Sequence, residues 1–318
     1  MHHIKKRPDT VECAAGGRLF EIVLPEPNLI EKMSPWTTNF RQIDAGPMQT
    51  QLRMRNGKAL SLLEIGMDRA VHQQGQAPPE TLTLGIVLSR SRLRWKNSTV
   101  DRKSLLSFGD ESGFEGLSDA SFHGITFSVS DVEVGMLADR LGLPINSAIR
   151  SSGVFRPSQD AVGLQSLAEL ALSYLRPECD VAMTQDDEEA ILALLLQVAS
   201  LPGQLNERGI GQKRTRAVRM ALEIMEENIE ENVPISRICE ASGVSLRTLN
   251  RAFHEVYGLG PKAYYVRMRL GLLRRALLES DSSRSVADLA NPLGFWHMGQ
   301  LARDYRSQFG ELPSETRG

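Results

Sequence analysis

The C-terminal part of the chain contains the same pattern twice. Residues 245–261 read Ser-Leu-Arg-Thr-Leu-Asn-Arg-Ala-Phe-His-Glu-Val-Tyr-Gly-Leu-Gly-Pro, and residues 297–313 read His-Met-Gly-Gln-Leu-Ala-Arg-Asp-Tyr-Arg-Ser-Gln-Phe-Gly-Glu-Leu-Pro. The matching pairs, all at an offset of 52 residues, are Leu249 with Leu301, Arg251 with Arg303, Phe253 with Tyr305, Gly258 with Gly310, and Pro261 with Pro313. A repeat on this scale indicates a duplicated supersecondary unit.

Each copy has the features of a helix-turn-helix unit. A short helix containing Ala241 or Ala290 ends at a turn with Gly243 or Gly294, and such small residues let two helices cross closely. The two glycines are 51 residues apart, so we expect one turn to differ by a residue. Three- and four-residue spacing predicts a buried stripe on each second helix. The stripe residues are Leu249, Ala252, Phe253 and Val256 in the first unit, and Leu301, Tyr305 and Phe309 in the second.

The other faces of these second helices are polar and suit contact with DNA. Arginine can bridge guanine O6 and N7, and asparagine or glutamine can bridge adenine N6 and N7. The candidate DNA-binding residues are Arg247, Thr248, Asn250, Arg251, Lys262, His297, Gln300, Arg303 and Arg306. Lys262, with Arg267 and Arg284, suits phosphate contacts. For any single arginine, a solvated helix face is the alternative.

A connecting helix is predicted between the two units, from Pro261 to Leu278. Some 20 residues of helix span roughly 30 Å. Recognition helices about 34 Å apart enter successive major grooves on one face of the duplex. We therefore expect one chain to read two adjacent groove segments.

The repeat resembles the DNA-binding domain of AraC/XylS-type transcription regulators. The resemblance rests on Gly-Val-Ser-x-Arg-x-Leu-x-Arg-x-Phe at 243–253, Tyr-Gly-x-x-Pro at 257–261, Gly-Phe at 294–295, and Arg303, Tyr305, Phe309-Gly310 and Pro313, and it covers about Arg214 to Arg317. It implies promoter DNA and RNA polymerase as partners, a homodimer, activation more often than repression, and a small-molecule sensor that is often cupin-like. Gly299 and Asn291-Pro292 depart from the pattern, so the second unit is expected to read sequence more loosely.

The N-terminal half has the pattern of a β-rich domain. Apolar runs at Leu60–Ile65, Leu82–Leu88 and Gly124–Val129 are separated by turn residues, as in an antiparallel sheet or barrel. The expected fold is α+β multidomain: a cupin-like β-barrel sensor at 1–155, a helical linker or dimerisation element at 156–200, and an all-α double helix-turn-helix domain at 213–318. The helices predicted at Ser158–Tyr174 and Asp186–Ala199 either cover the barrel or form a dimer contact.

A second motif suggests a ligand for the sensor. Arg90 and Arg94 form an RxxxR pattern, followed by an Asp-x-Ser turn and a glycine, which resembles the PilZ-type signature for cyclic di-GMP; Gly116 comes one residue late. Arginines can fork onto phosphate or guanine. The candidate ligand residues are Arg90, Arg92, Arg94, Trp95, Asp110, Ser112 and Gly116. This resemblance implies control of exopolysaccharide, adhesion or motility genes. Another metabolite in the barrel, or no ligand, is the alternative.

The composition of the chain fits a globular protein with a DNA-binding domain. The 318 residues are 41% hydrophobic and 24% charged, as in a globular protein. Residues 213–318 carry 16 Lys and Arg against 13 Asp and Glu, a net charge of +3 on a chain whose total is −2, which suits a polyanion-binding module. The apolar runs are too short to cross a bilayer, so a cytoplasmic, membrane-free protein is expected.

Other chemistry is not indicated by the sequence. Cys13, Cys179 and Cys239 lack disulfide or zinc spacing, and His72 and His123 are isolated in the β-rich region. We therefore expect no metal, no catalytic residues and no cofactor. An N-terminal enzyme with a DNA anchor, or a structural DNA binder without a ligand, are the competing hypotheses.

Overall fold

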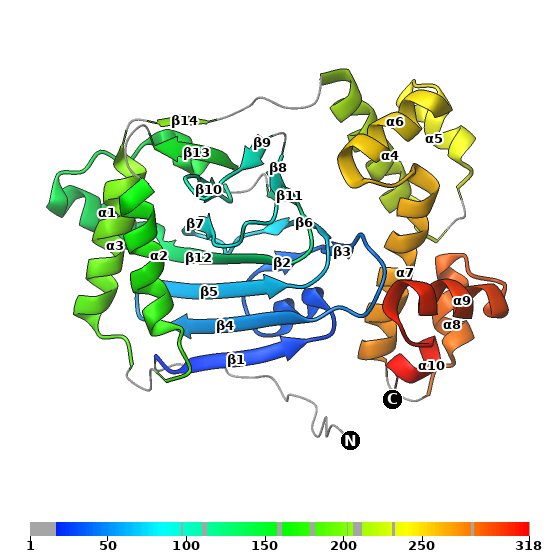
Figure 1. Cartoon of the computed structure of the whole chain (residues 1–318), viewed down its shortest axis with the longest axis horizontal. Coiled ribbons are helices and arrows are strands. Elements are labelled where there is room, and N and C mark those ends of the chain that lie inside the picture. The colour runs from blue at the N-terminus through cyan, green and yellow to red at the C-terminus, as the bar shows by residue number, and fades with distance from the viewer. Residues whose placement is uncertain are drawn as a thin grey trace.

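The computed structural model describes residues 17–96, 98–109, 113–157, 161–178, 182–201, 203–205, 212–230, 233–280 and 283–317. Its helices gather at two ends of the molecule. Figure 1 shows α1–α3 at one end, the strands in the middle, and the C-terminal helices α4–α10 at the other end.

The larger sheet has eight strands in the order β1-β4-β5-β12-β7-β10-β13-β14, all in antiparallel pairs. The bounds are β1 Leu19–Leu24, β4 Thr50–Asn56, β5 Leu60–Met67, β7 Thr81–Val87, β10 Leu105–Ser107, β12 Phe122–Ser130, β13 Gly153–Pro157 and β14 Gly203–Leu205. The three apolar runs of the sequence lie in β5, β7 and β12, which confirms them as strands.

The smaller sheet has the order β2-β6-β11-β8-β9, and β3 also pairs with β6. Its bounds are β2 Thr37–Thr38, β3 Arg41–Gln42, β6 Val71–Gln76, β8 Leu93–Trp95, β9 Ser98–Val100 and β11 Phe114–Ser118. Both strand orders are linear in the described residues, so these are two open sheets. The cupin-like β-barrel expected from the sequence is therefore not what the structure shows. Strand-forming segments can be recognised from local alternation, but closure depends on pairing between distant strands.

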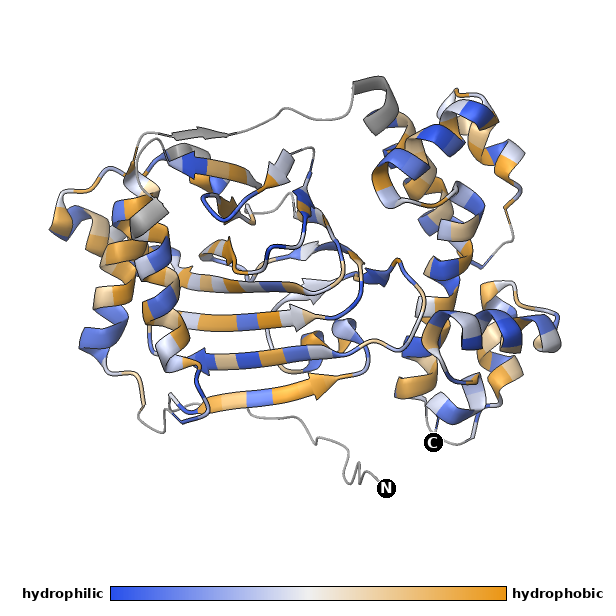
Figure 2. Cartoon of the chain, in the orientation of Figure 1, coloured by the Kyte–Doolittle hydropathy of each residue, from blue (hydrophilic) through white to orange (hydrophobic). Residues whose placement is uncertain are grey.

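Two apolar cores hold the N-terminal region together. One lies between the sheets and includes Leu52, Leu63, Trp95 and Phe114. The other lies between the larger sheet and the helices α1 (Asp131–Leu141), α2 (Ala161–Tyr174) and α3 (Gln185–Ser200). Figure 2 shows apolar residues along β5, β12 and these helices.

Helices α2 and α3 confirm the two helices predicted after the β-rich region, and they cover the sheet. Leu167 and Leu195 are fully buried in the core that they share with β5 and β12. The Glu188 carboxylate on α3 accepts hydrogen bonds from the main-chain N–H groups of Lys58, Ala59 and Leu60 at the β4–β5 hairpin. Helix α1 and strand β14 were not predicted; β14 lies between the helical element expected at 156–200 and the domain expected at 213–318.

The C-terminal region is helical, as predicted. Its helices are α4 Gln212–Glu227, α5 Ile235–Ser242, α6 Leu246–Tyr257, α7 Pro261–Glu279, α8 Val286–Ala290, α9 Met298–Phe309 and α10 Pro313–Thr316. The predicted stripes of α6 and α9 are buried, with Val256 half-buried. No helix among the described residues has the length and apolar character needed to cross a membrane.

Candidate DNA-binding surface and the domain contacts

The first helix-turn-helix unit is formed by α5 and α6. Gly243 ends α5 with φ of 66°, a left-handed conformation that suits glycine. Ser245 then caps α6, its hydroxyl accepting from the Thr248 N–H at 3.2 Å. These two signals fix the sharp turn between the helices.

The predicted contact residues of α6 lie on its outer side. Arg247, Thr248 and Arg251 are exposed, and Asn250 is half-exposed. The Arg251 Nε donates to Glu255 at 3.0 Å, and the Thr248 hydroxyl contacts the Ser245 hydroxyl. Arg247 is the second residue of α6 and so lies in its first turn, where a side chain reaches a base edge most easily.

The second unit is formed by α8 and α9, and its turn differs as predicted. A short 3₁₀ turn, Asn291–Leu293, follows α8 before Gly294 with φ of 75°. His297 is the N-terminal cap of α9 without a side-chain capping bond. Gly294 precedes the His297 cap by three residues, whereas Gly243 precedes the Ser245 cap by two, so the second turn is one residue longer.

On α9 the predicted contact residues are exposed and partly interconnected. His297, Gln300, Arg303 and Arg306 are exposed. Arg303 donates to the side-chain oxygen Oε1 of Gln300 at 2.8 Å, and the side-chain amide of Gln300 donates to the Asp304 carboxylate at 2.7 Å. These bonds hold the arginine and the glutamine in one row along the helix.

The phosphate candidates separate into two groups. Lys262 and Arg284 are exposed. Arg267 is half-buried, and its Nη1 is buried without a hydrogen bond among the described residues. Burial lowers the pKa of Arg267, while the charge of Asp44 in the N-terminal region raises it. Arg267 therefore lies at the contact between the two regions.

Sequence reasoning missed one exposed aromatic side chain at the second unit. Trp296 is 69% exposed and directly precedes His297. The other tryptophans, Trp36 and Trp95, are 8% and 1% exposed. The signal available in the sequence was its position in the predicted turn, directly before the residues predicted to contact DNA.

A buried polar network joins the C-terminal region to the smaller sheet. The Arg41 guanidinium on β3 donates to Tyr264 on α7 at 3.0 Å and forms an ion pair with Glu226 on α4 at 2.5 Å. His72 Nδ1 lies 2.6 Å from the same Tyr264 hydroxyl, and His72 Nε2 lies 3.0 Å from Glu115. Because a carboxylate only accepts, Nε2 carries the proton and Tyr264 donates to Nδ1.

Charges in this network are set by burial and by the partners. Burial lowers the pKa of His72, although the Glu115 carboxylate opposes this. Burial alone would raise the pKa of Glu115, but hydrogen bonding to His72 and Tyr257 outweighs it and lowers that pKa. Burial alone would lower the pKa of Arg41, but its contacts with Tyr264 and Glu226 outweigh burial and raise that pKa. The histidine is therefore neutral between a carboxylate and a tyrosine.

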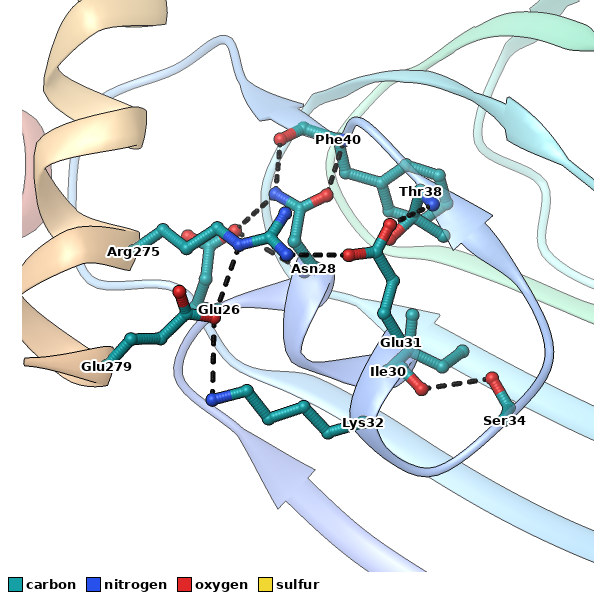
Figure 3. A network of polar contacts seen from close by, with 10 residues as sticks. All are labelled: Glu26, Asn28, Ile30, Glu31, Lys32, Ser34, Thr38, Phe40, Arg275 and Glu279. Atoms are coloured by element: carbon teal, nitrogen blue, oxygen red, sulfur yellow. Dashed lines mark hydrogen bonds and ion pairs between the residues drawn. The ribbon is translucent and has the colours of Figure 1, made fainter.

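A second contact joins helix α7 to the 3₁₀ helix η1 (Pro27–Lys32). Figure 3 shows Arg275 between Glu31 and Glu279, and Lys32 beside Glu279. The Arg275–Glu31 distance is 2.7 Å. Nearby, Glu26 accepts from the Asn28 amide at 2.7 Å, and burial raises the pKa of this carboxyl to about 7.

The second unit is also held by the N-terminal region. Gln308 on α9 is buried. Its side-chain amide donates to the main-chain carbonyl of Asp44 at 3.0 Å, and its main-chain carbonyl accepts from the Gly46 N–H at 2.9 Å. Both helix-turn-helix units and the connecting helix thus contact the N-terminal region, while the predicted DNA-contact side chains remain exposed.

The predicted ligand residues do not all come together. Arg90 and Arg92 are exposed. Trp95 is buried between the sheets, stacked on Phe114 with ring centroids 5.3 Å apart, and a side chain at Gly116 would meet its ring. The Arg94 guanidinium donates to the main-chain carbonyls of Glu255 and Val256 at the end of α6. Asp110 and Ser112 lie outside the described residues.

The two histidines of the β-rich region are separate. His72 is buried in the network described above, and His123 Nε2 lies 2.6 Å from Glu64. Among the described residues, no group of three or more His, Cys, Asp or Glu side chains is placed to hold a metal ion.

Comparison with known proteins supports the interpretation of the C-terminal region. Residues 238–318 match a helix-turn-helix domain family, so this part of the chain is a helix-turn-helix domain. The "XylDLEGF operon transcriptional activator 1" of Pseudomonas putida is 36% identical over 110 residues, which are 34% of this chain and 33% of that protein. The match thus spans about a third of the relative's length.

The chain also matches parts of solved structures. A probable AraC family transcriptional regulator from Rhodopseudomonas palustris is 36% identical, with 32% of this chain and 94% of that chain covered and a TM-score of 0.30. The AraC-like transcriptional activator CuxR is 14% identical, with 80% and 91% covered and a TM-score of 0.40.

Proposed function

We propose that this chain is a transcription regulator of the AraC/XylS type that binds specific DNA sequences and activates promoters under control of a small-molecule effector. One observation carries the proposal. Two helix-turn-helix units present exposed polar side chains on α6 and α9, and a 19-residue helix, α7, connects them. At 1.5 Å per residue, α7 is about 28 Å long. This length suits successive major grooves on one face of DNA.

The chemistry of both helices fits base reading. Arg247 and Asn250 in the first unit and Gln300 and Arg303 in the second have side chains that pair with purine edges in the major groove. Lys262 and Arg284 provide charge for the phosphates on either side. The relative from Pseudomonas putida is named a transcriptional activator, which favours activation over repression.

Selection from a random duplex library tests the proposal. The full chain should enrich two short sequence blocks whose centres lie about 10–10.5 base pairs apart. The first block should be the better defined, because the turn before α9 is altered and Gly299 offers no side chain there. Equal binding to all sequences, with a purely salt-driven affinity, would instead identify a structural DNA binder.

The effector is a separate part of the proposal, and cyclic di-GMP is its leading candidate. Arg90 and Arg92 are exposed and available to a phosphate or a guanine, which favours the candidate. Trp95 is not available for stacking, because it packs in the core. Isothermal titration with cyclic di-GMP should give micromolar or tighter binding that is lost in an Arg90→Ala, Arg94→Ala double variant. If the wild type gives no heat of binding, cyclic di-GMP is not the effector and other metabolites are tested in the same way.

The proposal has three further parts. The chain forms a homodimer, it contacts RNA polymerase, and it regulates genes for surface polysaccharide. A dimer would double the number of groove segments read and so multiply specificity. Sedimentation with and without cyclic di-GMP measures the oligomeric state directly. An N-terminal enzyme would instead turn over a substrate, which the same purified protein can be assayed for.

A further inference from the structure

The turn before helix α9 carries a tryptophan whose neighbours in the chain are fixed to the protein. Phe295 packs against the apolar core of the second unit, and the guanidinium carbon of Arg269 lies 5.2 Å from the centre of its ring. The Phe295 N–H donates to the last carbonyl of α8 at 3.2 Å. On the other side, the His297 carbonyl accepts from two main-chain N–H groups of α9, at 3.0 and 2.9 Å. The backbone that carries Trp296 is therefore held on both sides, while Trp296 itself is 69% exposed.

The space beside this tryptophan at the start of α9 is empty. At the offset of 52 residues that relates the two units, Gly299 is the counterpart of Arg247. A Cβ atom placed on Gly299 would meet no neighbouring atom of the described residues within 4 Å. The second unit thus lacks the side chain that the first unit presents in the first turn of its recognition helix. Trp296, three residues before Gly299, is the large exposed side chain nearest to this gap in sequence.

Trp296 also lies at the end of α9 that DNA can reach. It precedes Gln300 by four residues and Arg303 by seven, and these two polar side chains form one hydrogen-bonded row along the helix. The opposite end of α9 is covered, because Gln308 is buried and donates to Asp44 of the N-terminal region. The residues at the N-terminal end of a recognition helix are those that contact base edges in the major groove. Trp296 therefore belongs to the surface that would enter the groove.

The chemistry of the indole ring limits what Trp296 can contact there. The ring is flat and apolar, with one N–H donor. The apolar group that a base pair presents in the major groove is the C5 methyl of thymine, whereas the other groups are hydrogen-bond donors and acceptors. Exposure alone would not indicate a ligand, since single apolar side chains are common on protein surfaces. The position of Trp296 at the start of a recognition helix, beside an empty position, does indicate one.

We infer that Trp296 contacts the C5 methyl group of a thymine and so determines specificity at one base pair of the second DNA block. The inference rests on the proposed function, sequence-specific DNA binding, and names one of its contacts. Contact between the ring and the methyl group removes apolar surface of both from water, which favours thymine over cytosine at that position. Gly299 permits the approach, because no side chain stands between the helix and the base pair.

Replacement of thymine by deoxyuridine tests the contact, because deoxyuridine lacks only the C5 methyl group. In the duplex that the full chain selects, the second block is the one whose base preference Arg247→Ala leaves unchanged. Each thymine on either strand of this block is replaced in turn, and fluorescence anisotropy measures the affinity. One replacement should weaken wild-type binding about threefold to fivefold, the loss expected for one buried methyl group. Trp296→Ala should bind the thymine and deoxyuridine duplexes equally, and Trp296→Phe should retain part of the difference.

Two control variants separate this contact from a general loss of affinity. Leu246→Ala removes an apolar side chain, 53% exposed, from the start of α6 and should keep the full deoxyuridine effect in the second block. Arg303→Ala should weaken binding but keep the same ratio between the two duplexes.

The inference is overturned if no thymine of the second block responds, or if Trp296→Ala still distinguishes the two duplexes. Both results would leave sequence-specific binding standing. Selection that enriches no sequence would refute the proposed function itself, and the inference with it.

Discussion

The hydroxyl of Tyr264 on helix α7 lies 2.6 Å from Nδ1 of His72 on strand β6, and 192 residues separate the two in sequence. Arg41 donates to the same hydroxyl at 3.0 Å. The tyrosine ring packs against Tyr257 and Phe253 of the recognition helix. One buried side chain thus connects the sheet, the connecting helix and the first helix-turn-helix unit.

Removing this hydroxyl should loosen the contact between the two regions. Tyr264→Phe keeps the ring but removes one hydrogen bond each from Arg41 and His72, which keep Glu226 and Glu115 as partners, at a cost of about 1–3 kcal/mol in the free energy of unfolding. Urea denaturation measures the loss. Tyr265→Phe is the control, because its hydroxyl donates to the Asn228 carbonyl within the helical region. In an NMR spectrum only Tyr264→Phe should shift the His72 ring resonances; unchanged resonances would contradict the contact.

The raised pKa of Glu26 predicts a pH dependence of stability. The folded protein holds this proton up to about pH 7, whereas the carboxyl ordinarily loses it near 4.5. The stabilising contribution of the protonated form is complete below about pH 4.5 and is lost as pH rises through 7. His72 acts oppositely, because its pKa is lowered and its contribution is lost as pH falls below 6.5.

Glu26→Gln isolates the glutamate from the histidine. The variant resembles the protonated acid, so at pH 8 it should be more stable than the wild type, by up to about 3 kcal/mol. The two proteins should converge towards pH 4.5. Thermal unfolding midpoints across this range provide the measurement. Parallel curves for Glu26→Gln and wild type would refute the assignment.

Trp296 should report DNA binding through its fluorescence. It is the exposed one of the three tryptophans in the chain, and it adjoins the N-terminal cap of α9. Titration with the selected duplex should change the emission of the wild type and of Trp36→Phe, but not that of Trp296→Phe. If emission does not respond to saturating DNA, the start of α9 does not approach the duplex.

Arg247 and Lys262 should differ in their effects on DNA affinity. Arg247→Ala should cost roughly 1–3 kcal/mol on the selected sequence and relax the preference at one base pair. Lys262→Ala should weaken binding equally on all sequences and reduce the salt slope by about one. Fluorescence anisotropy at several salt concentrations separates the two. Equal losses for Arg247→Ala on selected and random DNA would make Arg247 a phosphate contact.

Much of the C-terminal region could be predicted because its signals are local. Helical spacing gave the stripe through Leu249 and Phe253, and Gly243 and Ser245 marked the turn between helices within three residues of one another. The β-rich region was recognised from alternation in the same way. Trp95, predicted as a ligand residue, packs in the core, because on a short strand one residue of register decides which face of the sheet a side chain occupies.

By itself, the sequence determined the two helix-turn-helix units, their spacing along α7 and the exposed side chains suited to base edges, because each depends on residues within a few turns of chain. Only the tertiary structure decided that the sheets stay open and that Arg94 meets the end of α6. It also decided that His72, Tyr264 and Arg41 form one buried network. Such contacts depend on which distant segments pack together, and no local periodicity encodes that.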